Sequence, residues 1–467
     1  MKVYDMGFQS WDEARKYHGR WWSPEKPEHL FSGVLRFEDG SPRLTIWSPA
    51  IGQEFYALSK PDKIYGELES GEKVTLWDFY GSHLHDRQTN KPYTKSRRFF
   101  TYAILGCHLT SPKDQHFRYS SYRLRGLPGF SERLNPVPAS LPETERPRYV
   151  DAKFSIDDEE IVYQITARIE NPRQLESSEK GEDVYFPYSS EDVRITFECS
   201  PPAPLKIHDE LLLEFQRLLA FVCVDIIPVE NEWLGVSSRS VMYPVMRRDS
   251  VRDVRKYATA DIFNSNMLVT LHQVAPEILL PRWWKAVKNL YPATEIISTY
   301  NQGTRGVLES STSSAIALAE RLQEVIDPKA RRYERSKYRE IQAKISEKFD
   351  DDLELAALLK SLLNNRLTLR GKLEILANAV TPERLSLMGI ESSAWIKDVR
   401  DVRDLLAHTG SHVKGRSSGA ATKLVRVNQE TRAIVSILIL KLMELDDQVL
   451  DQAAEITGER LRRFFGS

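Results

Sequence analysis

The alternation of hydrophobic and polar residues changes along the chain. Between residues 30 and 125, short alternating runs are separated by Gly, Pro, Asp and Ser, as in strands joined by turns. These runs are FSGVLRFEDG, PRLTIWS, KIYGELESGEKVTLWDF and RRFFTYAILGCHL. The first part of the chain is therefore predicted to be rich in β-strands.

The strand pattern continues beyond the proline-rich segment 133–149, which is either a linker or a long connection between sheets. Strand signals return in KFSIDDEEIVYQITARI and SSEDVRITFECS. Residues 208–223 have helical spacing, VDIIPV at 224–229 reads as a strand, and 281–291 reads as a short helix. We place a domain boundary near 300, so that residues 1–300 form a β-rich region, possibly split near 133–149.

Helical periods dominate from about residue 308 to the end. They cover 309–326, 331–348, 351–364, 372–380, 392–408, 424–445 and 448–465. Residues 301–467 are therefore predicted to form an α-helical bundle, and the fold class is α+β. We find no repeat of fixed period and no glycine-rich phosphate loop.

Composition narrows the class of protein. The formal net charge of −1 over 467 residues excludes a wholly basic nucleic-acid coat, so any basic site is local. Three cysteines without CxxC spacing favour neither a disulfide framework nor a zinc site. The most apolar run, AIVSILILKLM at 433–443, is too short to span a bilayer, and the N-terminus lacks the apolar core of a secretion signal. We expect a soluble cytoplasmic protein.

Candidate chemistry lies on the helix that begins near Ser392. Trp395, Val399, Val402 and Leu406 form one apolar stripe, and Arg403, Asp404 and His408 lie off it. Asp404 and His408 are one turn apart, so the carboxylate can orient the imidazole. This set suits RNA cleavage by attack of a 2′-OH on the adjacent phosphate, because His moves a proton near neutral pH and Arg stabilises the phosphorane. The reaction needs no metal and no cofactor.

Two facts weigh on this interpretation: the angle between the two side chains on the helix, and the frequency of such a motif by chance. Arg403 lies about 140° around the helix from His408, which a composite site across a two-fold dimer would accommodate. Arg and His at this spacing also occur by chance, and charged residues are common at helix ends without any function.

Two basic segments flank the motif. Residues 328–348 carry eight Lys and Arg against three Glu, and residues 411–426 carry Lys414, Arg416, Lys423 and Arg426 without an acid. Such segments can follow a phosphate backbone or simply solvate a surface. Glu320, on the first helix of the bundle, is a candidate supporting acid for the Arg and His pair, although a surface salt bridge explains it as well.

Other candidates have a structural explanation. His83 and His85 form an HxH pair, but nothing nearby completes a metal site, and a polar hairpin loop is the better interpretation. Trp21, Trp22, Trp283 and Trp284 are expected to be core residues rather than a stacking platform. We predict no metal site.

The stretch WIKDVRDVRDLLAHTG at 395–410 resembles the motif of the HEPN superfamily of α-helical ribonucleases, in particular ApeA-like abortive-infection proteins of bacteria. The family motif is Arg, a polar residue, three residues and His, which corresponds to Arg403, Asp404 and His408. Asp404 replaces the more frequent Asn. The N-terminal stretch GRWWSPEKPEHLFSGVLRFEDGSPRLTIW, followed by KIYGELESGEKVTLWDF, is similar to the ApeA N-terminal domain.

The resemblance implies a dimeric, metal-independent endoribonuclease that stops phage propagation by cleaving host RNA, with transfer RNA as a candidate target. It also implies that the N-terminal region senses a phage trigger or restrains the enzyme. Two alternatives remain: a catalytically silent HEPN dimer that binds nucleic acid or a partner, and a β-rich ligand-binding protein whose helical tail only dimerises. Arg403 and His408 together favour the ribonuclease. The basic segment 411–426, which we call the basic loop, disfavours a mere dimerisation tail.

Overall fold

The chain divides into two compact units. The computed structural model describes residues 16–38, 40–48, 63–85, 94–110, 115–131, 149–158, 161–170, 193–225, 227–237, 242–248, 267–301, 307–363, 365–409 and 418–466. Unit 1 comprises Met1–Ala220, Ile226–Asn264 and Thr270–Pro281, and unit 2 comprises Phe221–Asp225, Ser265–Val269 and Arg282–Ser467. The domain limits at residues 300 and 301 stay a prediction.

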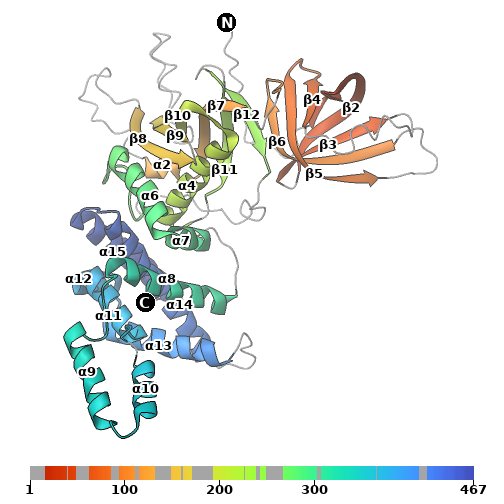
Figure 1. Ribbon diagram of the computed structural model, residues 1–467. Coiled ribbons are helices and arrows are strands. Elements are labelled where there is room, and N and C mark those ends of the chain that lie inside the picture. The colour runs from red at the N-terminus through yellow and green to blue at the C-terminus, as the bar shows by residue number, and fades with distance from the viewer. Residues whose placement is uncertain are drawn as a thin grey trace, which may run out of the picture. The chain divides into compact units, whose positions relative to one another are not determined.

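Unit 1 is built on one antiparallel sheet of twelve strands (Figure 1). The strands are β1 Lys16–Ser23, β2 Lys26–Glu38, β3 Ser41–Ser48, β4 Lys63–Leu68, β5 Lys73–His85, β6 Thr94–Leu105, β7 His116–Leu124, β8 Tyr149–Asp158, β9 Ile161–Glu170, β10 Arg194–Pro204, β11 Val229–Gly235 and β12 Tyr243–Arg247. Their order is β3-β2-β1-β4-β5-β6-β12-β11-β7-β10-β9-β8, and β3 also pairs with β6. This extra pairing closes the first six strands into a barrel, which removes their free edges.

The barrel is filled by side chains that alternate inward along its strands. Trp21 is fully buried and lies over Gly66 and Gly33 on neighbouring strands. A Cβ at Gly66 would lie 2.3 Å from the Trp21 ring, so only glycine leaves room for the indole. Packing of large against small residues thus explains both glycines.

The other half of the sheet packs against α4, Leu205–Cys223. His208 on this helix is fully buried, and its ring contacts the Ser120 hydroxyl at 2.8 Å and the Phe117 carbonyl at 2.9 Å. Burial lowers the pKa of His208 to about 4, so the ring is neutral and serves to join the helix to β7. Unit 1 also contains the short helix α2, Leu127–Phe130, and the start of α6, Pro276–Leu290.

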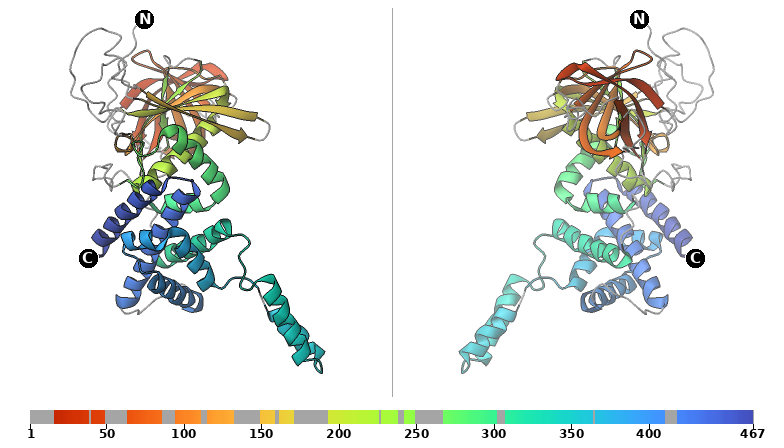
Figure 2. Two further views of the ribbon diagram at one scale, coloured as in Figure 1. Left: turned by 90° about the vertical axis from the view of Figure 1, so that its left-hand side faces the viewer. Right: turned by 90° about the vertical axis from the view of Figure 1, so that its right-hand side faces the viewer.

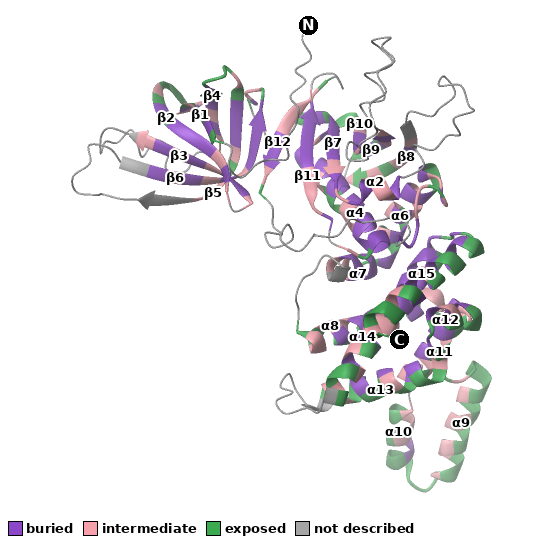
Figure 3. Cartoon of the chain, turned by 180° about the vertical axis from the view of Figure 1, so that it is seen from behind, coloured by how far each residue is buried: buried purple, intermediate pink, exposed green. Residues whose placement is uncertain are grey.

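Unit 2 is helical, and its burial pattern is shown in Figure 3. Besides the end of α6, its helices are α7 Ala293–Asn301, α8 Leu308–Ile326, α9 Arg335–Lys348, α10 Leu353–Leu362, α11 Leu369–Val380, α12 Pro382–Met388, α13 Ser392–Thr409, α14 Ser418–Leu442 and α15 Asp447–Phe465. The apolar run 433–443 lies in α14 and just beyond it, and α14 contacts α8, α11, α13 and α15. No helix among the described residues is long and apolar enough to cross a membrane.

The α+β fold class is confirmed, since strands fill the N-terminal region and helices follow. Most predicted segments match, with the following differences. The predicted strand at 224–229 is wrong for residues 224, 225, 227 and 228: α4 ends at Cys223, and the next strand, β11, begins at Val229. His83 and His85 lie at the end of β5, paired with Arg97 and Lys95, rather than in a hairpin loop. Helices α2, α7 and α12 were not predicted, because they are too short for a clear periodic signal.

The tryptophan prediction is confirmed for two of four residues. Trp21 and Trp283 are fully buried. Trp22 and Trp284 are only partly buried, and Trp22 meets the His108 ring edge to face at 5.3 Å. Partial exposure is common for tryptophan because of its size.

Candidate functional site

Helix α13 has one buried and one exposed face. Its N-terminus is capped by the Glu391 carboxylate, which accepts hydrogen bonds from the backbone amides of Ser393 and Ala394 at 2.9 and 2.6 Å. The hydrogen bonds from Ser393, and then the one from Ala394, lower the pKa of Glu391. A cap of this kind satisfies amides that no helical partner can reach.

The predicted apolar stripe anchors this helix in the bundle. Trp395, Val399 and Val402 are at most 1% exposed, and Leu406 is partly buried. The Trp395 indole donates a hydrogen bond to the Thr431 hydroxyl of α14 at 3.1 Å. This anchoring turns Arg403 and Asp404 to the exposed face of the helix.

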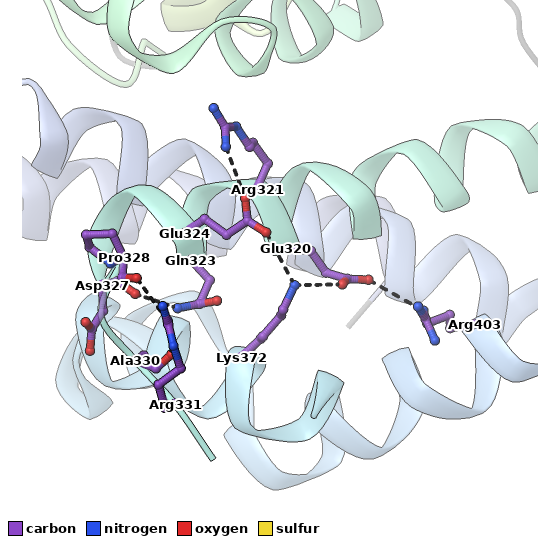
Figure 4. A network of polar contacts seen from close by, with 10 residues as sticks. All are labelled: Glu320, Arg321, Gln323, Glu324, Asp327, Pro328, Ala330, Arg331, Lys372 and Arg403. Carbon is purple, nitrogen blue, oxygen red and sulfur yellow. Dashed lines mark hydrogen bonds and ion pairs between the residues drawn. The ribbon is translucent and has the colours of Figure 1, made fainter. Parts of the chain in front are cut away.

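Arg403 belongs to a chain of charges that crosses three helices (Figure 4). Its Nε lies 3.5 Å from Glu320 Oε1 of α8, and Lys372 Nζ of α11 lies 3.2 Å from Glu320 Oε2 and 3.7 Å from Glu324. The side chains of Glu320 and Lys372 are 23% and 19% exposed, whereas that of Arg403 is 52% exposed. The network thus orients a guanidinium that solvent, and an incoming anion, can reach.

The predicted catalytic residues are only partly described. Arg403 and Asp404 are exposed on α13, and the structure brings Arg403 and Glu320 together. His408 lies in the last turn of the same helix, but its side chain lies outside the described residues. The roles of these residues therefore stay predictions.

The predicted RNA-binding residues lie in two different settings. Lys414 and Arg416 fall outside the described residues, and Arg426 is exposed on α14. Lys423 Nζ lies 2.8 Å from a carboxylate oxygen of both Asp398 and Asp401 on α13. Hydrogen bonds to Asp398 and then to Asp401 raise the pKa of Lys423. Its charge is thus partly neutralised within the protein.

Sequence reasoning named Glu320 as a candidate partner of the Arg and His pair, but it missed the partners of Glu320 and Lys423 on other helices. Lys372 sits 52 residues from Glu320, and Asp401 sits 22 residues from Lys423. Charge pairs within one helix are visible in sequence at spacings of three or four, but pairs between helices are not. No signal in the sequence identified these contacts.

Glu430 of α14 adds a group that titrates near neutral pH. Burial raises its pKa to about 7, Arg426 opposes the rise and Asp398 adds to it. Because the folded protein holds this proton more tightly than the unfolded chain, Glu430 favours folding at low pH. That contribution is lost as the pH rises through about 7.

We therefore expect Glu430→Gln to raise the melting temperature at pH 8.5 and to have little effect at pH 4.5. The expected gain is about 1–2 kcal/mol after discounting for partial exposure, or about 3–6 °C. Thermal unfolding followed by helical circular dichroism at both pH values measures it. Glu444→Gln is the control, since that side chain is 69% exposed. An equal effect in both variants would contradict the prediction.

No group of three or more His, Cys, Asp or Glu within the described residues is placed to hold a metal ion.

Comparison with known proteins assigns the family. No curated protein and no solved structure matches the chain. The family model described as ApeA N-terminal domain 1 matches residues 16–283, which is more than half of the chain. The match supports an ApeA-like role in anti-phage defence. The protein thus belongs to the family defined by the ApeA N-terminal domain 1.

Proposed function

We propose that this protein is a metal-independent endoribonuclease of an abortive-infection system, with a HEPN-type site on α13. Arg403 carries the proposal: it is half-exposed and oriented by Glu320, on the same helix as His408. Family membership supports the defence role. The proposed substrate is host RNA in the cytoplasm, with transfer RNA as the first class to test.

In the proposed reaction, the ribose 2′-OH attacks the adjacent phosphorus and the 5′-oxygen leaves. His408 moves the proton of the 2′-OH to the leaving 5′-oxygen, and Asp404, one turn before it, orients the imidazole. Arg403 stabilises the extra negative charge on the pentacoordinate phosphorus with its planar guanidinium. Products would carry a 2′,3′-cyclic phosphate and a 5′-OH.

The angular offset between Arg403 and His408 leads us to propose a composite site. About 140° separates the two positions on an ideal helix, so two copies of α13 facing each other across a two-fold axis would bring the groups together. In this proposal residues 1–300 respond to a phage-derived trigger and residues 301–467 cleave RNA.

Cleavage in the presence of EDTA is the direct test of this chemistry. We expect purified protein to cleave total host RNA with unchanged rate after chelation, because the proposed proton transfer and charge stabilisation use side chains only. Phosphatase treatment identifies the ends. A 2′,3′-cyclic phosphate should resist phosphatase until mild acid opens it, and the enzyme should then remove the phosphate. Activity that EDTA abolishes and a divalent ion restores would rule out the mechanism.

A silent, nucleic-acid-binding HEPN dimer is the second candidate. It is favoured by the ion pair of Arg403 with Glu320, since a guanidinium held by a carboxylate can have a purely structural role. Binding of RNA without any cleavage by the wild-type protein would select this function.

The basic loop is expected to act on binding rather than on chemistry. Neutralising Lys414 and Arg416 together should weaken RNA binding. It should also reduce the slope of log binding constant against log salt concentration by about one unit per lost phosphate contact. The rate at saturating RNA should change little. Filter binding over a salt series measures the slope, and Lys285→Gln, on an exposed side chain of α6, is the control.

Lys423 is expected to behave differently from the loop residues. Since Asp398 and Asp401 already hold its ammonium group, Lys423→Gln should change the salt slope less than either loop substitution. A full unit of slope lost at Lys423 would show that RNA displaces both aspartates.

A further inference from the structure

Helices α9 and α10 form an antiparallel hairpin: they lie side by side in Figure 1, and in the two views of Figure 2, turned by 90°, one lies in front of the other. Its base is joined by hydrogen bonds in both directions between Tyr333 and Asn365, at 2.8 and 3.1 Å. The Tyr338 hydroxyl donates to the Leu363 carbonyl at 2.6 Å. At the tip, the Asp352 carboxylate caps α10 by accepting from the Leu355 amide at 2.9 Å. These hydrogen bonds join the two helices at the base and cap α10 at the tip, so the hairpin has a defined structure.

The hairpin exposes apolar residues. None of the fourteen residues of α9 is buried, and in α10 only Ala356 is buried. Leu355, Leu358 and Leu362 are 36%, 54% and 69% exposed. On an ideal helix these three lie within an arc of about 60°, so they form one stripe, which we call the leucine stripe. A contiguous stripe of exposed leucines marks an interaction surface.

Charge is polarised along the same hairpin. The base, residues 329–340 and 360–366, has eight Lys and Arg against two Glu, a net charge of +6. The tip, residues 344–354, has two Lys against five Asp and Glu, a net charge of −3. A hairpin with one positive and one negative end is complementary to a second copy that runs in the opposite direction.

We propose that the leucine stripe binds the leucine stripe of a second copy of this chain, with the two hairpins antiparallel about a two-fold axis. The tip of each hairpin then lies against the base of its partner. Leu358, in the middle of the stripe, lies at the axis and meets its own counterpart, as an isologous interface requires. An RNA ligand would match the basic base but would leave the leucines and the acidic tip without partners.

A cysteine at the axis tests this arrangement. Under mild oxidation we expect Leu358→Cys to form a covalent dimer, because the two copies of residue 358 adjoin. Leu213→Cys is the matched control, since Leu213 is also exposed, at 42%, but lies on α4. Wild type, with its three cysteines, sets the background. A Leu358→Cys protein that cross-links no more than these controls would overturn the proposal and leave the stripe to another partner.

Charge reversal tests the antiparallel direction. In the Leu358→Cys background, one variant carries Glu347, Asp350 and Asp351 changed to Lys, and another carries Arg335, Arg339 and Lys360 changed to Glu. The first variant changes the net charge of the tip from −3 to +3, and the second changes that of the base from +6 to 0. Each alone removes the attraction between tip and base, so cross-linking should fall about tenfold, whereas mixing the two brings one tip of −3 against one base of +6 and should restore it. Asp352 is kept because it caps α10. Unchanged cross-linking in both variants, or a mixture that fails to recover, would contradict the antiparallel pairing.

These experiments are independent of RNA cleavage. Cross-linking is measured on the full chain without RNA, and all substituted positions of the hairpin are solvent-accessible, so circular dichroism should remain that of the wild type. Failure of the hairpin pairing leaves the proposed ribonuclease unaffected, and absence of cleavage leaves the pairing unaffected.

Discussion

His408→Ala is expected to abolish RNA cleavage and toxicity while changing RNA affinity little. The substitution removes the proposed proton-transfer group but leaves the basic loop, and proton transfer is typically worth about a hundred- to ten-thousandfold in rate. Arg403→Ala should cause a loss of similar size, because it removes the proposed stabilisation of the phosphorane. Single-turnover cleavage and equilibrium binding of the same RNA separate the two effects.

The matched control for both variants is Arg400→Ala. Arg400 is an exposed arginine on the same helix, about one turn before Arg403, and has no role in the proposed chemistry. It should retain wild-type cleavage. Full activity in His408→Ala, or unfolding of its helical unit, would make the motif structural and favour the silent binding protein. Sequencing the RNA ends from cells that express wild type or His408→Ala would identify the substrate.

Trp395→Ala is expected to have the largest effect on stability, with a loss of about 3–5 kcal/mol of unfolding free energy, as for other buried tryptophans. The indole is 1% exposed, and its removal opens a cavity under α13 and leaves the Thr431 hydroxyl without this hydrogen bond. Since α13 carries Arg403 and His408, cleavage should fall even where the protein still folds. Denaturant unfolding and cleavage assays on one preparation measure both.

Two control variants separate the effect of the cavity on stability from the effect of the lost hydrogen bond. Trp395→Phe keeps a buried ring but not the indole N–H, and Thr431→Val removes the acceptor. Both should cost less than Trp395→Ala, because the transfer of apolar surface outweighs one neutral hydrogen bond. If Trp395→Ala were as stable as wild type, the stripe would not anchor α13.

The extent of sequence-based prediction differs between the helices. Residues 392–408 were predicted as one helix with a buried stripe of Trp395, Val399, Val402 and Leu406. The helix and the burial of the first three are confirmed, whereas Leu406 is only partly buried. A helix of 18 residues repeats its apolar period often enough to be seen. The seven residues of α12 contain too few turns to show a period. Barrel closure by β3 and β6 was not predicted, since strand pairing over long separations leaves no local signal.

The leucine stripe also shows what a helical period in the sequence does not predict. A helical period over 351–364 was predicted, but a period states only which side is apolar, not whether another element covers it. Contacts in the folded chain leave Leu358 and Leu362 exposed. The same holds for Lys423, whose partners on α13 were invisible to spacing within one segment.

The sequence by itself determined the α+β class, the order of strands before helices, and the position of the Arg403, Asp404 and His408 motif on one amphipathic helix. These follow from local periodicity, which depends only on neighbouring residues. Glu320 was a candidate partner from the sequence, but only the tertiary structure decided that Lys372 joins it beside Arg403, that Asp398 and Asp401 hold Lys423, and that β6 closes the barrel. Such contacts join residues far apart in the chain, and their partners are selected by the packing of whole helices and sheets rather than by any local pattern.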